Sequence, residues 1–379
     1  MGPLSGVKVV EMAGLAPAPF GCMILADLGA EVLRIDRAGA HAGLVTPPGV
    51  LDRGRRTIAV DLKTPTGVRV VHEVVAHADV FVEGYRPGVA ERLGIGPEAL
   101  CGLNPRLVYG RMTGWGQDGP LAARAGHDIN YIAIAGALEP IGRAGERPHA
   151  PQNLLADFAG GGLMLALGIV SALYERDQSG RGQVVDAAMV DGAALLTTFL
   201  HGMRAAGMWP GERGTNALDG GAPFYDTYET ADGKFMAVGC VEPHFYAQLL
   251  AKLGLADAEL PNQLDARGWP EVRNAIAGVF AQKTRAEWTE IFADSDACVS
   301  PVLTPWEAHE HPHNQARRAF IKVGDALQPA PAPRFSRTAS AEPGLVNHGA
   351  KDIADTLGAW GLKPGVVDEL VAARAVHDP

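Results

Sequence analysis

The chain has 379 residues, of which 47% are hydrophobic and 20% charged, and its formal net charge is −10 at pH 7. These proportions exclude a disordered chain and predict a folded protein long enough for two or three domains. The negative charge repels polyanions, so we expect no nucleic-acid partner, and an anionic ligand requires a local basic patch.

Cysteine usage and the N-terminal residues indicate the compartment. Four cysteines lie far apart without CxxC spacing, which argues against a disulfide framework or a zinc site. Residues 1–14 lack the basic and apolar segments of a secretory signal, and no apolar run reaches the length of a membrane span. We therefore expect a cytoplasmic protein with no membrane partner and no metal.

The first 110 residues alternate between strand-like and helix-like segments. Strands are predicted at 7–13, 31–37, 79–85 and 106–112, with helices at 16–30 and 67–78. This alternation is typical of a parallel α/β sheet of Rossmann-like type, covered on both faces. Residues 142–148 resemble a solvent loop. One long helix is expected over 154–182, ended by Gly180.

The second half of the chain reads as a smaller α+β unit. Asp232-Gly233 between two β-type runs predicts a hairpin, followed by helices at 244–254 and 269–294. Residues 326–340 are proline-rich and indicate a linker before a C-terminal helix near 351–375. The predicted domains are a large α/β domain (1–205), a glycine-rich linker (206–224), a small α+β domain (225–310), and a linker and helix returning to the large domain (311–379).

Polar residues follow several predicted strands and are expected to meet at the carboxyl edge of the sheet, where such folds bind ligands. They are Asp36-Arg37, Glu83-Gly84-Tyr85-Arg86 and Arg111-Met112-Thr113-Gly114. Arg53, Arg55, Arg56 and Lys63 form a local basic excess that suits a phosphate-bearing ligand. A solvated charged loop is an equally good interpretation. No GxGxxG follows the first strand and no P-loop motif occurs.

Three further residues are candidates for chemistry, each with a structural alternative. His127 lies between Gly126 and Asp128, and a structural histidine is the simpler interpretation. Asp157 precedes three glycines, as a helix N-cap often does, and neighbouring N–H groups would then be available to an oxyanion. Glu242 follows the predicted hairpin, where an acidic residue also suits a helix start.

Many segments resemble, in order, the class III CoA-transferase family, and within it the branch of α-methylacyl-CoA racemases. They are GPLSGVKVVEMAGLAPAPFGCMILADLGAEVLRIDR, VDLK, VEGYRPGVAERLG, RMTGWGQDGP, AGHDINYIAIAGAL, LLADFAGGG, GQVVDAAMVDG, DGGAPFYDTYETADGKFMAVGCVEPHFY and APRFSRT. The resemblance covers nearly the whole chain except about the last forty residues. It implies an interlocked homodimer, an acyl-CoA substrate, a place in fatty-acid or other lipid metabolism, and no separate cofactor.

The resemblance also implies roles for the candidate residues. Racemases in this family use the aspartate matching Asp157 and the histidine matching His127 as two acid/bases on opposite faces of one carbon. Transferases use the aspartate as a nucleophile and typically carry no histidine at that place, so a CoA-transferase is the alternative. Asp128 would support Asp157, and Glu242 of the other subunit would orient His127. A protein that only binds acyl-CoA is a third, non-enzymatic possibility.

The CoA moiety is expected to contact a further set of residues. The phosphate ligands implied by resemblance are Arg37, Lys63, Arg86 and Arg92. Neighbouring contacts are expected from Val60, Asp61, Leu62, Gly84, Tyr85, Gly126, Ile129, Asn130 and Tyr131. The segment 38–56 departs from the family pattern in length and residues.

Two properties of the predicted site follow from physical chemistry. A helix N-terminus lowers the pKa of a carboxyl group, whereas burial raises it, and a useful base requires the second effect at Asp157. Met112, Met189 and Met203 are candidates for an adaptable acyl site or for core packing. The sequence is compatible with branched fatty acyl, sterol or bile-acid side-chain, and arylpropionyl thioesters.

Overall fold

A computed structural model describes residues 2–39, 51–345, 347–348 and 353–377, and the chain forms two compact units. The larger unit contains residues 1–135, 152–196 and 317–379, and the smaller unit contains 136–151 and 197–316. Residues 136–151 and 197–205 were expected in the large domain but belong to the smaller unit. Ion pairs within that unit hold the first of these segments, namely Arg143–Asp226 and Arg213–Glu139.

The larger unit is built on a sheet whose strand order is β12-β3-β2-β1-β4-β5-β6. Apart from the edge strand β13, which runs antiparallel to β3, the strands are parallel, and the predicted α/β fold is confirmed. The order reverses at β1 and β4, as in doubly wound folds, which bind ligands at that point beyond the carboxyl ends. The strands are β1 (Lys8–Met12), β2 (Glu31–Arg37), β3 (Arg56–Val60), β4 (Val80–Glu83), β5 (Val108–Thr113), β6 (Val184–Ala188), β12 (Asn347–His348) and β13 (Val376–His377).

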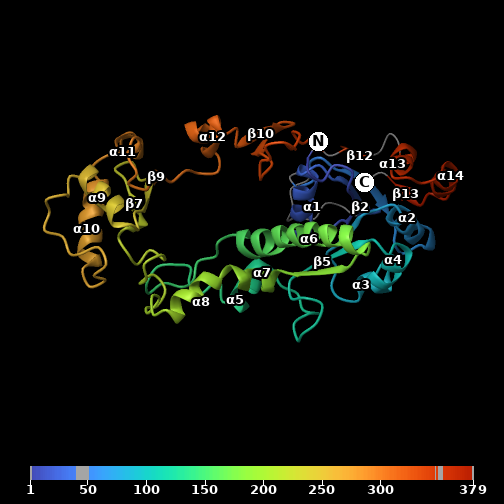
Figure 1. Ribbon diagram of the computed structural model, residues 1–379, viewed down its shortest axis with the longest axis horizontal. Helices are drawn as coiled ribbons and strands as arrows, with labels where there is room; N and C mark the ends of the chain where they lie inside the picture. The colour runs from blue at the N-terminus through green and yellow to red at the C-terminus, as the bar shows by residue number, and fades with distance from the viewer. Residues whose placement is uncertain (1, 40–50, 346, 349–352, 378–379) are drawn as a thin grey trace. The chain divides into compact units, whose positions relative to one another are not determined.

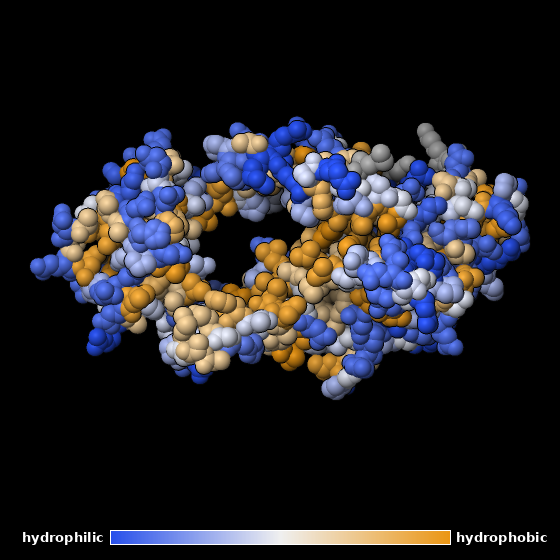
Figure 2. Space-filling model, viewed as in Figure 1, coloured by the Kyte–Doolittle hydropathy of each residue, from blue (hydrophilic) through white to orange (hydrophobic). Residues whose placement is uncertain are grey.

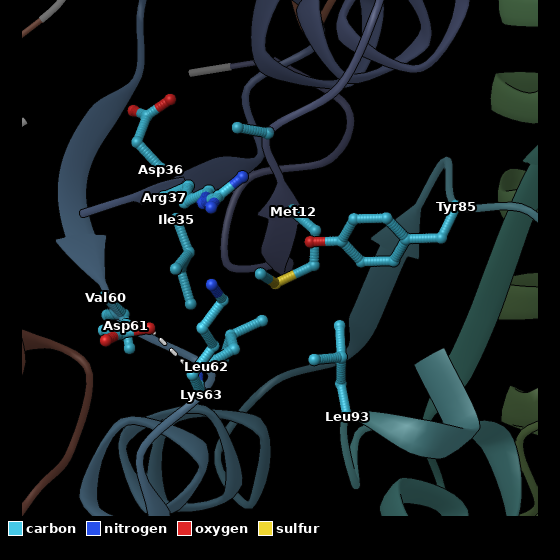
Figure 3. Close-up of a pocket in the computed structure, with 11 residues that line it drawn as sticks. Met12, Ile35, Asp36, Arg37, Val60, Asp61, Leu62, Lys63, Tyr85 and Leu93 are labelled. Atoms are coloured by element: carbon cyan, nitrogen blue, oxygen red, sulfur yellow. Dashed lines mark hydrogen bonds between the residues drawn. The ribbon is translucent and has the colours of Figure 1, made fainter. Parts of the chain in front are cut away.

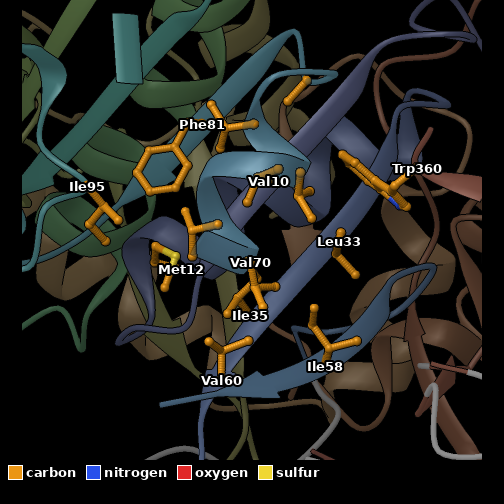
Figure 4. Close-up of a cluster of buried hydrophobic side chains, with 14 of the residues drawn as sticks. Val10, Met12, Leu33, Ile35, Ile58, Val60, Val70, Phe81, Ile95 and Trp360 are labelled. Carbon is orange, nitrogen blue, oxygen red and sulfur yellow. The ribbon is translucent and has the colours of Figure 1, made fainter. Parts of the chain in front are cut away.

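Helices cover both faces of this sheet. One face packs against α2 (Pro65–Val75), α4 (Pro97–Leu103) and the C-terminal helices α13 (Ile353–Ala359) and α14 (Pro364–Ala372). Trp360 shares that buried cluster with strand residues such as Leu33 (Figure 4). On the other face α1 (Pro17–Asp27) packs against α6 (Met164–Ser179), which lies along β5 (Figure 1).

The expected long helix is present, but its first part is a π-helix, η1 (Leu154–Leu163), that continues into α6 and ends at Gly180 with φ +77°. Its glycines permit close packing, since a Cβ on Gly160 would come within 2.7 Å of the Ala193 nitrogen on α7 (Met189–Leu196). Leu154–Ser179 is also long and apolar enough to cross a membrane, with mean hydropathy 1.8, so the expectation that no run reaches that length was wrong. Core helices of globular proteins meet the same criterion, and 39% of its most apolar window is buried.

Several elements differ from the sequence predictions, and the segment expected to be helical at 269–294 is two helices, at Trp269–Phe280 and Arg285–Phe292. Strand β3 was missed, because its residues lie within the arginine-rich segment that resembled a loop. The proline-rich linker begins with a hairpin of β10 (Phe320–Val323) and β11 (Ala326–Pro329). The C-terminal helix is two helices, because Gly361 adopts φ +99° and a Cβ there would come within 3.2 Å of the His77 ring.

The smaller unit contains a three-stranded antiparallel sheet with helices around it. The predicted hairpin is confirmed, since β7 (Tyr225–Glu229) pairs with β8 (Phe235–Gly239) and Gly233 turns between them with φ +70°. Strand β9 (Val299–Pro301) pairs with β8. The helices include α8 (Thr198–Ala205), α9 (Pro243–Lys252), α10 (Trp269–Phe280), α11 (Arg285–Phe292) and α12 (Pro312–Ala316).

Candidate active site

A cavity of about 300 Å³ lies at the carboxyl ends of β1, β2, β3 and β4, where the sequence predicted the CoA site. Lys63 and Arg37 contribute exposed positive charge to its lining, and the Tyr85 side chain points toward Met12 across it (Figure 3). Six of the predicted CoA-binding residues line this cavity: Arg37, Val60, Asp61, Leu62, Lys63 and Tyr85.

The turn after β3 presents Lys63 to this cavity. Asp61 accepts the backbone N–H of Lys63 at 3.0 Å, and Thr64 begins α2 by accepting the N–H of Gly67 at 3.0 Å. Gly67 is required there, because a Cβ would lie 2.1 Å from the Asp61 carbonyl oxygen. The sequence DLKTP thus encodes a tight strand-to-helix turn with its lysine in solvent.

The basic segment before β3 is not the anion site that its composition suggested. Arg53 is buried and donates two hydrogen bonds to Asp27, at 3.0 and 2.5 Å. Arg55 is buried and donates to Glu11 at 2.5 Å. These arginines form internal ion pairs. Of the four basic side chains in residues 51–63, only Arg56, which begins β3, and Lys63, which follows it, are exposed. The atypical residues 40–50 lie outside the described chain.

A second cavity, of about 390 Å³, adjoins the first at Tyr85, which lines both. His127 and Asp157, the two candidate acid/bases, line it together with Gly84, Arg86, Gly126 and Tyr131. Two of the predicted methionines, Met112 and Met189, line it as well, whereas Met203 belongs to the smaller unit. Three predicted contact residues line neither cavity: Arg92, Ile129 and Asn130.

His127 is exposed and stands at the start of α5 (Asp128–Ile134). Its backbone N–H donates to the Asn130 side-chain oxygen at 3.0 Å, and the Asn130 backbone N–H donates to the His127 carbonyl oxygen at 2.8 Å. The Tyr131 hydroxyl donates to the Gly126 carbonyl oxygen at 2.5 Å, and burial raises the pKa of Tyr131 to about 12, which keeps this donor protonated. The backbone carrying His127 is therefore held from both sides.

The position of the Tyr131 ring explains why residues 114 and 126, near the cavity, are glycines. Its ring packs edge-on against Trp115 with centroids 4.7 Å apart. A Cβ on Gly114 would lie 2.2 Å from the ring, and one on Gly126 would lie 2.7 Å from it. Glycine is thus needed at both places for the ring to reach its hydrogen bond.

Asp128 is buried and fastens η1 to the start of α5. Its Oδ2 accepts the backbone N–H groups of Ala156 and Asp157, at 2.7 and 2.8 Å. These two N–H groups are therefore not available to an oxyanion, and the N–H groups after Asp157, which were expected to serve one, lie within η1. Asp157 is also not an N-cap, because η1 begins three residues earlier, at Leu154.

The Asp157 carboxylate is half-buried and accepts the Asn153 side-chain amide at 3.2 Å. Burial raises the pKa of Asp157, and Asp128 adds to the rise while Asn153 and His127 oppose it. The effect of burial is therefore larger than the effects of Asn153 and His127, and the pKa of Asp157 is raised, as an acid/base requires. Asn153 was not predicted, although its i,i+4 spacing to Asp157 is a usable signal.

Glu242 belongs to the smaller unit, where it is exposed at the N-terminus of α9. Its expected action on His127 of the other subunit stays a prediction. Within the described part of the chain, no three His, Cys, Asp or Glu side chains are grouped as metal ligands.

Comparison with known proteins shows the family of the chain. The chain is 55% identical to alpha-methylacyl-CoA racemase of Mus musculus and 52% identical to that of Homo sapiens, over 88% of this chain and 87% of each relative. A solved CaiB/BaiF family protein from Brucella suis superposes with a TM-score of 0.81 at 25% identity, covering 94% of this chain and 99% of that one. The model of CoA-transferase family III matches residues 4–350, and the chain belongs to that family.

Proposed function

We propose that this protein is a racemase that interconverts the 2R and 2S epimers of 2-methylacyl-CoA thioesters. The observation that carries the proposal is that His127 and Asp157 line the same cavity, and that this cavity adjoins the one lined by Arg37 and Lys63. The names of the mouse and human relatives support the same reaction. The nucleotide part of CoA would occupy the basic cavity and the acyl part the other.

The reaction requires a proton to leave one face of C2 and another to arrive on the opposite face. One base takes the C2 proton, and the electron pair of that C–H bond moves into the thioester carbonyl, which gives an enolate. The second group then donates a proton to C2 from the other side, and the electron pair returns from oxygen. A single base would return its own proton, so both His127 and Asp157 are needed.

The protonation states of the two groups set the direction. Neutral His127 with protonated Asp157 starts one direction, and imidazolium with carboxylate starts the other. Burial raises the pKa of Asp157, which brings the carboxyl group nearer to histidine in proton affinity. A smaller difference in proton affinity between the two acid/bases makes both starting protonation states accessible.

We also propose that the protein acts as an interlocked homodimer in the cytoplasm, with Glu242 of one subunit orienting His127 of the other. On the η1–α6 helix, Leu163, Leu167 and Tyr174 share one side and are 51%, 56% and 72% exposed. Orange atoms gather over this part of the large unit in Figure 2. Exposed apolar surface of this kind is typical of subunit interfaces.

The test is incubation of one epimer of a 2-methylacyl-CoA in deuterated buffer without a second acid. Deuterium at C2 with loss of chirality is expected. A CoA-transferase is the alternative, since the chain is also 31% identical to acetyl-CoA:oxalate CoA-transferase of Acetobacter aceti. No exchange at C2, with CoA transfer once a free acid is added, would contradict the racemase and make Asp157 a nucleophile.

A further inference from the structure

Arg111 is a buried charged residue that lines neither cavity, yet it connects the loop and the helix beside the CoA site. It lies on β5, directly opposite Glu83 at the end of β4. Its Nε donates to Glu83 at 2.9 Å, and its Nη1 donates to Glu91 on α3 (Val89–Arg92) at 2.8 Å. One guanidinium fork therefore joins three elements.

The Glu83 end of this network holds the loop after β4. Glu83 is fully buried, and its second oxygen accepts the backbone N–H of Tyr85 at 2.6 Å. This bond fixes the chain where it turns out of the sheet at Gly84 and Arg86. Burial raises the pKa of Glu83, and the Tyr85 N–H and Arg111 oppose that rise. Arg111 thus stabilises the carboxylate that holds Tyr85 between the two cavities.

The Glu91 end holds α3 in the same way. Arg92, a predicted phosphate ligand, is the last residue of that helix, and Leu93 after it lines the basic cavity. Gly96 lies close against Glu91, because a Cβ on Gly96 would lie 2.9 Å from the Glu91 Cγ. A four-residue helix has little stability of its own, so its placement depends on such tertiary bonds.

We propose that Arg111 is a positioning residue for the CoA moiety, which fixes the loop of Tyr85 and the helix α3 before Leu93, two parts of the chain that line the basic cavity. This inference rests on the proposed function only in its assumption that CoA binds at this edge. Arg111 acts through Glu83 and Glu91 and does not touch the substrate. Its loss is expected to weaken nucleotide binding much more than it slows the chemistry at C2.

The test compares Arg111→Met with a matched control, Arg176→Met. Arg176 is 7% exposed, as Arg111 is, and pairs with Asp79 at 2.9 Å at the opposite, amino-terminal end of the sheet. Each variant is assayed with a 2-methylacyl-CoA and with the same acyl group on pantetheine, which lacks the nucleotide. CoA binding is measured separately by calorimetry, and thermal unfolding is recorded for each variant.

Arg111→Met should raise KM for the CoA thioester and the Kd for CoA by about tenfold or more, with kcat changed by less than about threefold. The KM for the pantetheine thioester should change much less than the KM for the CoA thioester. Arg176→Met should lower the melting temperature without changing KM. Equal losses with both thioesters, or an unchanged KM in folded Arg111→Met, would overturn the proposal.

A second variant covers a failure of Arg111→Met to fold. The Glu91 side chain is 45% exposed, so Glu91→Gln loosens only the α3 end and is compatible with folding. It should raise the Kd for CoA by a few fold, and an unchanged Kd would again reject the role. If the wild type racemises neither thioester, the proposed function fails, whereas the calorimetric comparison still decides the role of Arg111.

Discussion

Asp128 accepts the backbone N–H of Asp157 at 2.8 Å, so the buried Asp128 carboxylate holds the backbone of Asp157, one of the two candidate acid/bases. The same oxygen accepts the N–H of Ala156 at 2.7 Å. Because Asp128 immediately follows His127, the residues that carry both proposed bases are joined by these two bonds. Their separation is therefore fixed by backbone contacts and not by the flexible side chains alone.

Replacing Asp128 with alanine should lower both stability and kcat. Two buried N–H groups at the start of η1 would lose their acceptor, at a cost of roughly 1–3 kcal/mol each. Asp128→Asn keeps an acceptor oxygen and should be milder in both respects. Urea unfolding and the rate of C2 exchange measure the two effects, and wild-type kcat in the alanine variant would refute the supporting role.

His127→Ala and Asp157→Ala should each lower the rate of racemisation by about a thousandfold or more, because each removes one of the two groups that transfer the proton. Calorimetry should show that both variants still bind CoA, since we expect the nucleotide in the other cavity. Full turnover in either variant would exclude the two-base mechanism. Loss of activity in His127→Ala with intact CoA binding would exclude a protein that only binds acyl-CoA.

Glu242→Ala should slow exchange less than either base deletion, because we expect it to orient His127 and not to carry the proton. Mixing Glu242→Ala with His127→Ala tests action between subunits. If Glu242 acts on the other subunit, each mixed dimer contains one site with both residues intact and recovers wild-type kcat there. If it acts within its own subunit, mixing restores nothing.

Asp157→Asn should raise the melting temperature at neutral pH while removing activity. Burial raises the pKa of Asp157 in the folded state, so the folded protein loses stability as pH rises through that pKa and the group ionises. The amide carries no charge and avoids this loss. The difference between variant and wild type should shrink as pH falls toward the ordinary aspartate range; a difference that does not change with pH would contradict this.

Trp360→Ala should destabilise the large unit by about 3–5 kcal/mol, because a 2% exposed side chain is removed from the core beneath β2 and β3. Trp306 provides a matched control, since it is 81% exposed and its replacement should change stability by less than about 0.5 kcal/mol. Urea unfolding distinguishes them. Equal stability of the two variants would mean that the C-terminal helices are not part of the cooperative core.

The sequence determined the parallel α/β fold, the hairpin at Gly233 and the choice of His127 and Asp157, because each depends on local periodicity, turn chemistry or an ordered set of motifs. The tertiary structure decided what distant residues do to each other. It placed Arg53 and Arg55 in buried ion pairs, used Asp128 to bind the backbone N–H groups of Ala156 and Asp157, and placed Arg111 between Glu83 and Glu91. Charge in a sequence shows only that a partner is needed, whereas burial and distance determine which partner is reached.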